Sequence, residues 1–140
     1  MKITFLGILF VANLLIADHK TALIPSDEIK VLQLASQTLE HEEKRNRKDN
    51  RICPVTAITF SLYCALKYAT LQVYGKFDHR LPVIEEVRKT IEIVSQKNYQ
   101  HRLMDYNNDS ETTFTDIKNI LRITESRLSS GFKKNVRRYL

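Results

Sequence analysis

Residues 82–97, PVIEEVRKTIEIVSQK, decide the fold class of this chain. Aliphatic residues recur in this stretch at intervals of three and four, with charged residues between them. The aliphatic positions are Val83, Ile84, Val87, Ile91 and Val94. Such a period is that of an α-helix with one buried face, and Pro82 suits its first turn because no N–H is needed there. The stretch therefore predicts a helix that ends near residue 97.

Three further stretches show the same helical period. We predict helices over residues 26–41, 54–74 and 114–130. The first begins at the cap residue Ser26, and the last follows a capping-box pattern that starts at Thr113. The β-branched and aromatic residues of the middle stretch leave a strand as its alternative.

Proline and glycine support these boundaries. Pro54 suits the first position of the second helix, and Gly75 and Gly131 suit the residue that follows a helix. The chain has only three Gly and three Pro in 140 residues, which disfavours turn-rich β architectures. We therefore expect an all-α fold, a four-helix bundle.

Two polar connectors lie between the expected helices, over residues 42–51 and 98–110. The first is almost wholly charged or Asn and offers nothing to bury, so we interpret it as a solvated crossover; a basic docking patch is the alternative. The second is also interpreted as a connector without helix. Connectors of this length permit parallel as well as antiparallel neighbours, so the helix order stays open at this point.

The first residues are typical of a secretory signal peptide. Lys2 precedes an apolar run that ends at the small residue Ala17, and the run is shorter than the roughly 20 residues of a membrane-spanning helix. Cleavage nearer Ala22 and a membrane anchor are the alternatives. We expect a secreted, extracellular protein. The expected boundaries are 1–17 for the signal peptide, 18–131 for the bundle and 132–140 for a basic tail.

Motifs that carry enzyme chemistry are missing from the sequence. It contains no P-loop, GxGxxG, nucleophile elbow, HExxH or CxxC, and the four His have no partners at ligand spacing. We therefore expect no enzyme, no cofactor and no metal. The net charge of +6 and pI of 9.4 suit a glycosaminoglycan or an anionic lipid. Nucleic acid is not expected, because no aromatic residues interleave with the basic ones.

Two cysteines and one sequon are candidate modification sites. Along one continuous helix, eleven residues would place the Cα atoms of Cys53 and Cys64 about 16 Å apart, beyond the disulfide reach of about 7 Å. They can bond each other only if the helix starts late; two buried thiols and an intermolecular bridge are the alternatives. Asn108 begins an Asn-Asp-Ser glycosylation sequon, which is compatible with secretion.

Short words in three expected helices resemble the short-chain four-helix cytokines of the interleukin-15, interleukin-2 and interleukin-21 group. These words are Cys53 to Ala57 with Ala65 to Lys67 and Leu71 to Val73, Pro82 to Lys97, and Ile117 to Leu121 with Leu128 to Ser130. The resemblance implies an up-up-down-down bundle. It also implies a secreted ligand that binds cell-surface receptor chains, and we expect a monomer.

The same resemblance implies which residues meet the receptor. Asp27 or Glu28 would hold the acidic position that meets the beta receptor chain, and the last helix would face the gamma chain. Glu125 stands in that helix where the family usually has a Gln, and the family disulfide cannot form because residues 99–113 contain no Cys. The alternatives are a secreted interaction or defence protein that binds polyanions or anionic membranes through its basic segments, and a secretion product without a binding signature.

Overall fold

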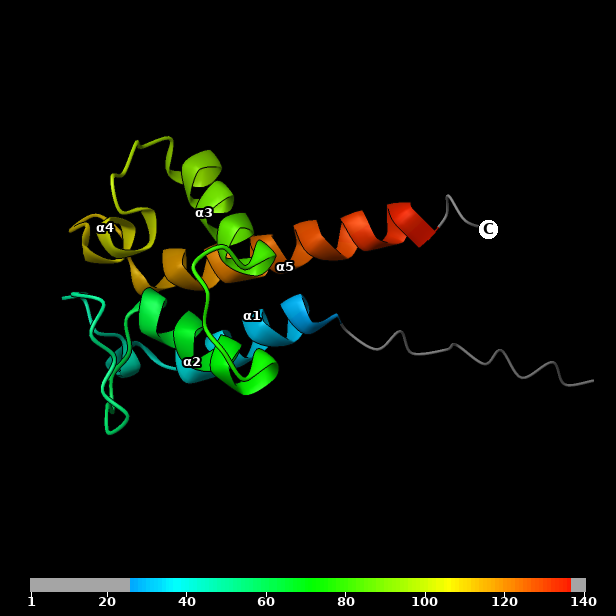
Figure 1. Cartoon of the computed structure of the whole chain (residues 1–140). Coiled ribbons are helices and arrows are strands. Elements are labelled where there is room, and N and C mark those ends of the chain that lie inside the picture. Colours follow the sequence, from blue (N-terminus) through cyan, green and yellow to red (C-terminus); the bar gives the residue numbers. More distant parts are fainter. Residues whose placement is uncertain (1–25, 137–140) are drawn as a thin grey trace, which may run out of the picture.

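The computed structural model describes the backbone of residues 26–136 and the side chains of residues 26–130. This part of the chain is all-helical, as the sequence predicted (Figure 1). Its elements are α1 (Asp27–Thr38), a 3-10 helix η1 (Glu42–Lys44), α2 (Leu62–Tyr74), α3 (Pro82–Ser95), α4 (Arg102–Asn108) and α5 (Phe114–Val136). The expected signal peptide, residues 1–17, lies outside the described residues.

Three predicted helices are confirmed as α1, α3 and α5. Ser26 caps α1 by accepting a hydrogen bond from the backbone N–H of Ile29. The capping box before α5 is reciprocal: Thr113 N donates to Asp116 Oδ2 (2.8 Å), and Asp116 N donates to Thr113 Oγ1 (3.1 Å). The expected stop at Gly131 is wrong, because α5 continues to Val136 and includes the first part of the expected basic tail.

Two other sequence-based expectations are wrong. The second helix begins at Leu62 rather than at Pro54, because Ser61 is the residue that caps it, accepting from the backbone N–H of Cys64. The expected connector over 98–110 contains the seven-residue helix α4, of which Leu103 and Tyr106 pack into the core. With seven residues, α4 is too short for a helical period to be recognised in the sequence.

Side chains on α1 and α5 show that these two helices are antiparallel. Gln33 Nε2 donates to Glu125 Oε1 (2.8 Å), whereas Lys118, two turns earlier on α5, donates from Nζ to Ser36 Oγ further along α1 (2.6 Å). The α3–α5 pair is antiparallel as well. Its contacts are Thr124 Oγ1 to Thr90 Oγ1 (3.0 Å) and Arg127 Nε to Glu86 Oε1 (2.8 Å).

The pair α1 and α2 is also antiparallel, which corrects the expected helix order. Phe60 N, just before α2, donates to Lys44 O in η1, which follows α1 (2.6 Å), and Tyr74 at the end of α2 lies near Glu28 at the start of α1. The directions of α1, α2, α3 and α5 therefore alternate along the chain (Figure 1). The up-up-down-down order that the cytokine resemblance implied is not present in the described residues.

The core lies between α1, α2, α3 and α5, with α4 closing one end. Its largest fully buried side chains are Leu32, Leu39, Leu62, Leu66, Ile84, Ile91, Ile117, Ile120 and Leu121. The aliphatic face predicted for the third helix supplies Val83, Ile84, Val87 and Ile91 to the core, whereas Val94 is 44% exposed. Burial of these faces is the main stabilising contribution to the fold.

The crossover after α1 is largely exposed, as its composition indicated, but it also buries Arg45 and Asp49, which the composition did not indicate. Arg45 is only 8% exposed, and its guanidinium donates to the carbonyls of Asn107 (2.7 Å) and Thr112 (3.0 Å). Asn107 is fully buried; its side chain accepts from Leu62 N (3.1 Å) and donates to Asn46 O (2.9 Å). We call Arg45, Asn46, Leu62, Asn107 and Thr112 the polar hub. It joins the crossover, α2 and α4.

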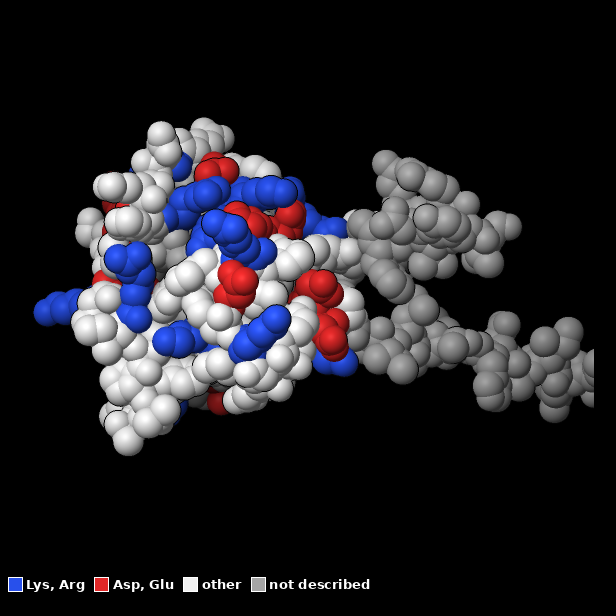
Figure 2. Space-filling view, in the orientation of Figure 1, with Lys and Arg blue, Asp and Glu red and all other residues white. Residues whose placement is uncertain are grey.

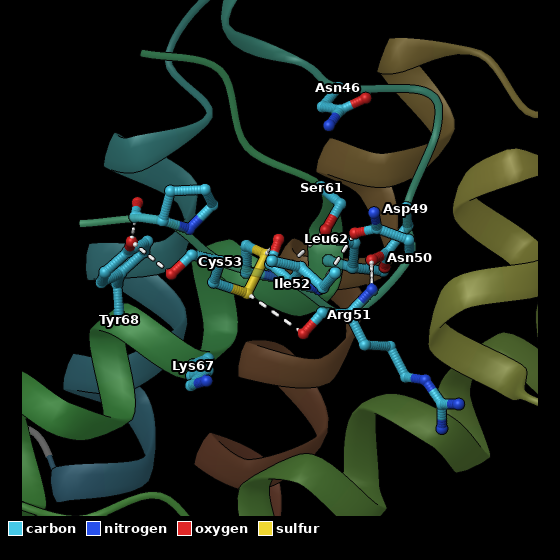
Figure 3. The surroundings of a disulfide bond; sticks show 12 residues. Asn46, Asp49, Asn50, Arg51, Ile52, Cys53, Ser61, Leu62, Lys67 and Tyr68 are labelled. Carbon is cyan, nitrogen blue, oxygen red and sulfur yellow. Dashed lines mark hydrogen bonds between the residues drawn. A yellow bond between two sulfur atoms is a disulfide. The ribbon is translucent and has the colours of Figure 1, made fainter. Parts of the chain in front are cut away.

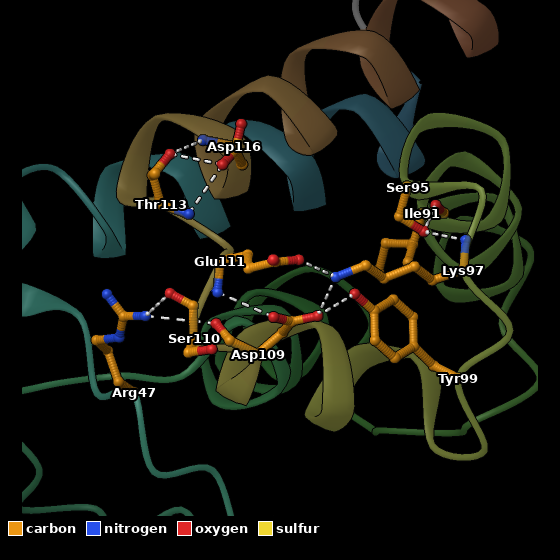
Figure 4. A network of polar contacts seen from close by, with 10 residues as sticks. All are labelled: Arg47, Ile91, Ser95, Lys97, Tyr99, Asp109, Ser110, Glu111, Thr113 and Asp116. Atoms are coloured by element: carbon orange, nitrogen blue, oxygen red, sulfur yellow. Dashed lines mark hydrogen bonds and ion pairs between the residues drawn. The ribbon is translucent and has the colours of Figure 1, made fainter.

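A second polar network closes the turn between α4 and α5 (Figure 4). Asp109 Oδ2 accepts from Lys97 Nζ (2.8 Å) and from the Tyr99 hydroxyl (2.7 Å), and its Oδ1 accepts from Glu111 N (2.9 Å). Lys97 also pairs with the Glu111 carboxylate (2.6 Å). These hydrogen bonds, with that from Lys97 the largest, hold the pKa of Asp109 well below its usual value.

The polar hub generates a stability prediction. Arg45→Ala leaves two buried carbonyls without donors, so we expect the free energy of unfolding to fall by about 2–4 kcal/mol, as measured by urea denaturation. Arg45→Lys keeps one charged donor group, so its free energy of unfolding should lie between those of the wild type and Arg45→Ala. A loss below about 1 kcal/mol for Arg45→Ala would contradict this role.

The Asp109 network predicts a pH dependence. A pKa lowered by folding gives stability that is present above the ordinary value of 3.8 and is lost as the pH falls below it. Asp109→Asn should therefore lower the urea midpoint at pH 7, and the difference from the wild type should shrink progressively below pH 3.8. Lys97→Met should remove most of this pH-dependent difference. A difference that stays constant into the acid range would argue against the network.

Candidate functional site

The residues expected to meet a receptor are on α1 and α5, but the structure does not bring them together. Asp27 pairs with Lys30 on the exposed first turn of α1 (2.8 Å). Glu125 contacts α1 through Gln33, about one and a half turns beyond Glu28. These carboxylates therefore form no single cluster among the described side chains.

A cavity of about 250 Å³ lies between α1 and α5, next to Glu125. Its charged wall includes Lys118, whose Nζ donates to Ser36 Oγ (2.6 Å), Ser36 O (2.7 Å) and Leu39 O (3.2 Å). All three donors of the ammonium are therefore used at the end of α1. Burial lowers the pKa of Lys118, yet the group holds the two helices together and has no donor left for a ligand.

The strongest surface feature is a loop between the crossover and α2. Ile52, Val55 and Ile58 are 69%, 92% and 78% exposed, and they account for three of the six exposed large hydrophobic residues among the described side chains. We call residues 52–58 the apolar loop. Single exposed aliphatic residues are ordinary on protein surfaces, but three on seven consecutive residues indicate a contact surface.

A disulfide holds the apolar loop in place (Figure 3). Cys53 and Cys64 are bonded, with their Cα atoms 5.5 Å apart, so of the alternatives left by the sequence the mutual bridge is the one present. The bond can form because α2 starts only at Leu62, so that Cys53 lies outside the helix; the spacing of the two cysteines required such a late start. The hydroxyl of Tyr68 on α2 donates to the carbonyls of Cys53 (3.1 Å) and Pro54. The loop is thus tied to α2 at its first residues.

Two Asx turns, in which an Asp or Asn side chain accepts from the backbone N–H two residues later, fix the chain just before the loop. Asp49 Oδ1 accepts from Arg51 N (2.7 Å), and Asn50 Oδ1 accepts from Ile52 N (3.0 Å). Between them Arg51 adopts a left-handed φ of 63°, which costs a non-glycine residue about 1 kcal/mol. The Arg51 side chain consequently extends away from the disulfide (Figure 3), while the chain continues into the apolar loop.

Exposed cations precede the apolar loop in the chain, and one of them, Arg47, also donates to the carbonyls of Asp109 (3.3 Å) and Ser110 (3.1 Å). Lys44, Arg47, Lys48 and Arg51 are exposed, and we call them the basic flank. The single acidic residue between positions 44 and 58, Asp49, is only 6% exposed, and burial raises its pKa. In Figure 2 blue side chains lie on the side of the molecule where this segment runs, and its lowest projection carries no charge.

The sequon places Asn108 at the end of α4, on the surface. Its side-chain amide is already used by the crossover: Oδ1 accepts from Asp49 N (2.7 Å), and Nδ2 donates to Asp49 O (2.9 Å). Nδ2 is the atom to which an N-linked glycan is attached. Glycosylation of Asn108 stays a prediction, and a glycan there would have to form beside this pair of hydrogen bonds.

The sequence did not predict the exposed apolar residues of the loop. The pattern assigned Ile58 to the buried face of a helix that starts at Pro54, and helix periodicity alone cannot detect that these residues lie outside the helix. Ser61, a residue type that commonly caps helices, is the local signal that could have shown the later start of α2.

Comparison with protein-family models, curated proteins and solved structures found no match for this chain. Within the described residues, no group of three or more His, Cys, Asp or Glu could hold a metal ion. None of the described helices has both the length and the apolar character needed to cross a membrane. Function is therefore argued from the geometry of the loop and its surroundings.

The disulfide between Cys53 and Cys64 generates a stability prediction. The bridge spans 11 residues of sequence, so Cys53→Ala with Cys64→Ala should lower the free energy of unfolding by about 3 kcal/mol, measured by urea denaturation. These mutations should also increase the rate of amide exchange, and the increase should be larger in residues 52–60 than in α3. Unchanged stability under oxidising conditions would show that the bridge does not constrain the loop.

Proposed function

We propose that this protein binds anionic membrane surfaces as a peripheral protein, with the apolar loop among the lipid headgroups and the basic flank on their phosphates. The observation that carries the proposal is the exposure of Ile52, Val55 and Ile58 on a disulfide-tied loop beside four exposed cations. An apolar tip with a cationic border is the chemistry of interfacial anchors.

The magnitudes fit weak, reversible binding. Full burial of a branched aliphatic side chain contributes about 1.5–3 kcal/mol, and each Lys or Arg near an anionic surface adds about 1 kcal/mol. Insertion to headgroup depth realises part of the first contribution. Because the disulfide and Tyr68 already order the loop, little conformational entropy is lost on binding.

Secretion is part of the proposal. The two cysteines of the chain are bonded to each other, and such bonds persist in oxidising compartments. The apolar segment over residues 1–17 supports the same destination. The first expectation, a receptor ligand that uses Asp27, Glu28 and Glu125, has less support, since the helix order differs from the one its resemblance implied and Glu125 is engaged with Gln33.

Vesicle binding by loop variants tests the proposal. We expect Val55→Ser with Ile58→Ser to weaken binding about ten-fold, equal to about 1.4 kcal/mol, to vesicles of phosphatidylcholine and phosphatidylserine at about 7:3. The measurement is co-sedimentation of the full chain. The loop variant keeps every residue outside the loop, so its difference from the wild type reports on the loop alone.

The matched control is Ile93→Ser with Val94→Ser, which changes two exposed aliphatic residues of α3, 57% and 44% exposed. This variant should bind like the wild type. An equal loss in both double variants, or no loss in the loop variant, would refute the proposal. Binding of the wild type to pure phosphatidylcholine should be weaker, because the basic flank then meets no net negative charge.

A further inference from the structure

A cationic pocket of about 210 Å³ lies beside the apolar loop, between the start of α2, α3 and α4. Side chains from five separate segments line it. Its polar lining includes Arg51, Tyr63, His79, Arg88, His101 and Arg102. No carboxylate is among the residues that line the pocket, so its walls are cationic or neutral.

Two of the arginines are held in place by bonds that use only one nitrogen each. Arg88 Nη1 donates to His79 O (2.8 Å) and Glu85 Oε1 (2.6 Å). Arg102 Nη1 donates to Glu92 Oε1 (2.7 Å). No hydrogen bond to a described residue uses Nε or Nη2 of either guanidinium. The partners therefore fix the side chains and leave most of their donors available.

The third arginine has no direct partner for its guanidinium among the described residues. The Arg51 guanidinium makes no ion pair or hydrogen bond with the described residues, and its backbone is held by Asp49 in the left-handed conformation. Glu85 and Glu92 together offset two of the three guanidinium charges. The Asp49 carboxylate also acts on Arg51, so the carboxylates lie around the pocket while the three guanidinium groups line it.

Aromatic packing shapes one wall of the pocket. The His79 ring stacks on Tyr63, with centroids 5.9 Å apart and planes 23° apart, and meets Phe77 edge-on at 4.9 Å. Burial raises the pKa of Tyr63, Arg51 and Arg88 act to lower it, and Asp49 acts to raise it, so both guanidinium groups and one carboxylate act on this ring. The wall is therefore ordered before any ligand arrives.

We propose that the cationic pocket binds a phosphate group, either free phosphate or the terminal phosphomonoester of a lipid headgroup. Guanidinium groups from three segments meet there, and a tetrahedral oxyanion with three terminal oxygens can accept from all three at once. A carboxylate has two oxygens and is matched by a single guanidinium fork. The inference extends the proposed membrane function but does not need it, because a free anion can enter the pocket without a membrane.

Titration of the full chain with inorganic phosphate, followed by NMR shifts of backbone amides, is the first test. We expect saturable shifts at residues of the pocket. Arg51→Gln should weaken binding about five-fold or more, since it removes charge-assisted donors without breaking an internal bond. The control Arg122→Gln removes the same charge from exposed α5 and should leave the affinity unchanged. Absence of saturable shifts, or equal loss in both variants, would overturn the proposal.

Vesicles distinguish the two sources of phosphate and separate this inference from the membrane proposal. Phosphatidic acid presents a phosphomonoester and phosphatidylserine a phosphodiester, so Arg51→Gln should weaken binding to the former more if the ligand is a headgroup. An equal effect on both lipids assigns the pocket to free phosphate. Val55→Ser with Ile58→Ser should leave the phosphate titration unchanged, so that loss of membrane binding and loss of phosphate binding are seen independently. Tighter binding of sulfate than of phosphate would overturn the assignment.

Discussion

The buried guanidinium of Arg45 is the constraint on which the rest of the structure depends. A charge taken out of water must find acceptors, and here it finds the carbonyls at the end of α4 and beyond. That contact positions Asn107, whose side chain accepts the N–H of Leu62 at the first turn of α2. The start of α2 is thereby set late, which brings Cys64 within reach of Cys53 and leaves the residues between them outside the helix. The apolar loop follows from this polar hub.

The sequence could predict the elements that are local and not those that depend on distant partners. The period of residues 82–97 identifies α3 because one face of that helix is buried along nearly its whole length. The same reasoning fails for residues 54–61, since Pro54 and Ile58 fit a helix locally while the disulfide and Asn107 hold the chain in another conformation. The composition of 42–51 likewise indicates solvent exposure, and the acceptors that bury Arg45 lie more than sixty positions away.

Helix order shows the same limit. A long connector after the first helix is compatible with a parallel neighbour, but this one doubles back on itself. Residues 44 and 46 pair with Phe60 through backbone hydrogen bonds, so the crossover ends close to where it began. The next helix must then return alongside α1 in the opposite direction. The candidate receptor residues were inferred from an up-up-down-down order of helices. The exposed residues of the apolar loop could be recognised only from the three-dimensional path of the crossover.

The apolar loop and the cationic pocket meet at one peptide unit, which links their proposed roles. Arg51 lines the pocket and Ile52 begins the loop, and the left-handed turn at Arg51 sends these neighbouring residues to different places. An unconstrained loop with three aliphatic residues would collapse onto the core to hide them from water. The disulfide and Tyr68 prevent that collapse, at the cost of exposed apolar surface. A lipid surface that covers the loop would offset this cost and would bring phosphate groups near the entrance of the pocket, so one orientation of the molecule serves both sites.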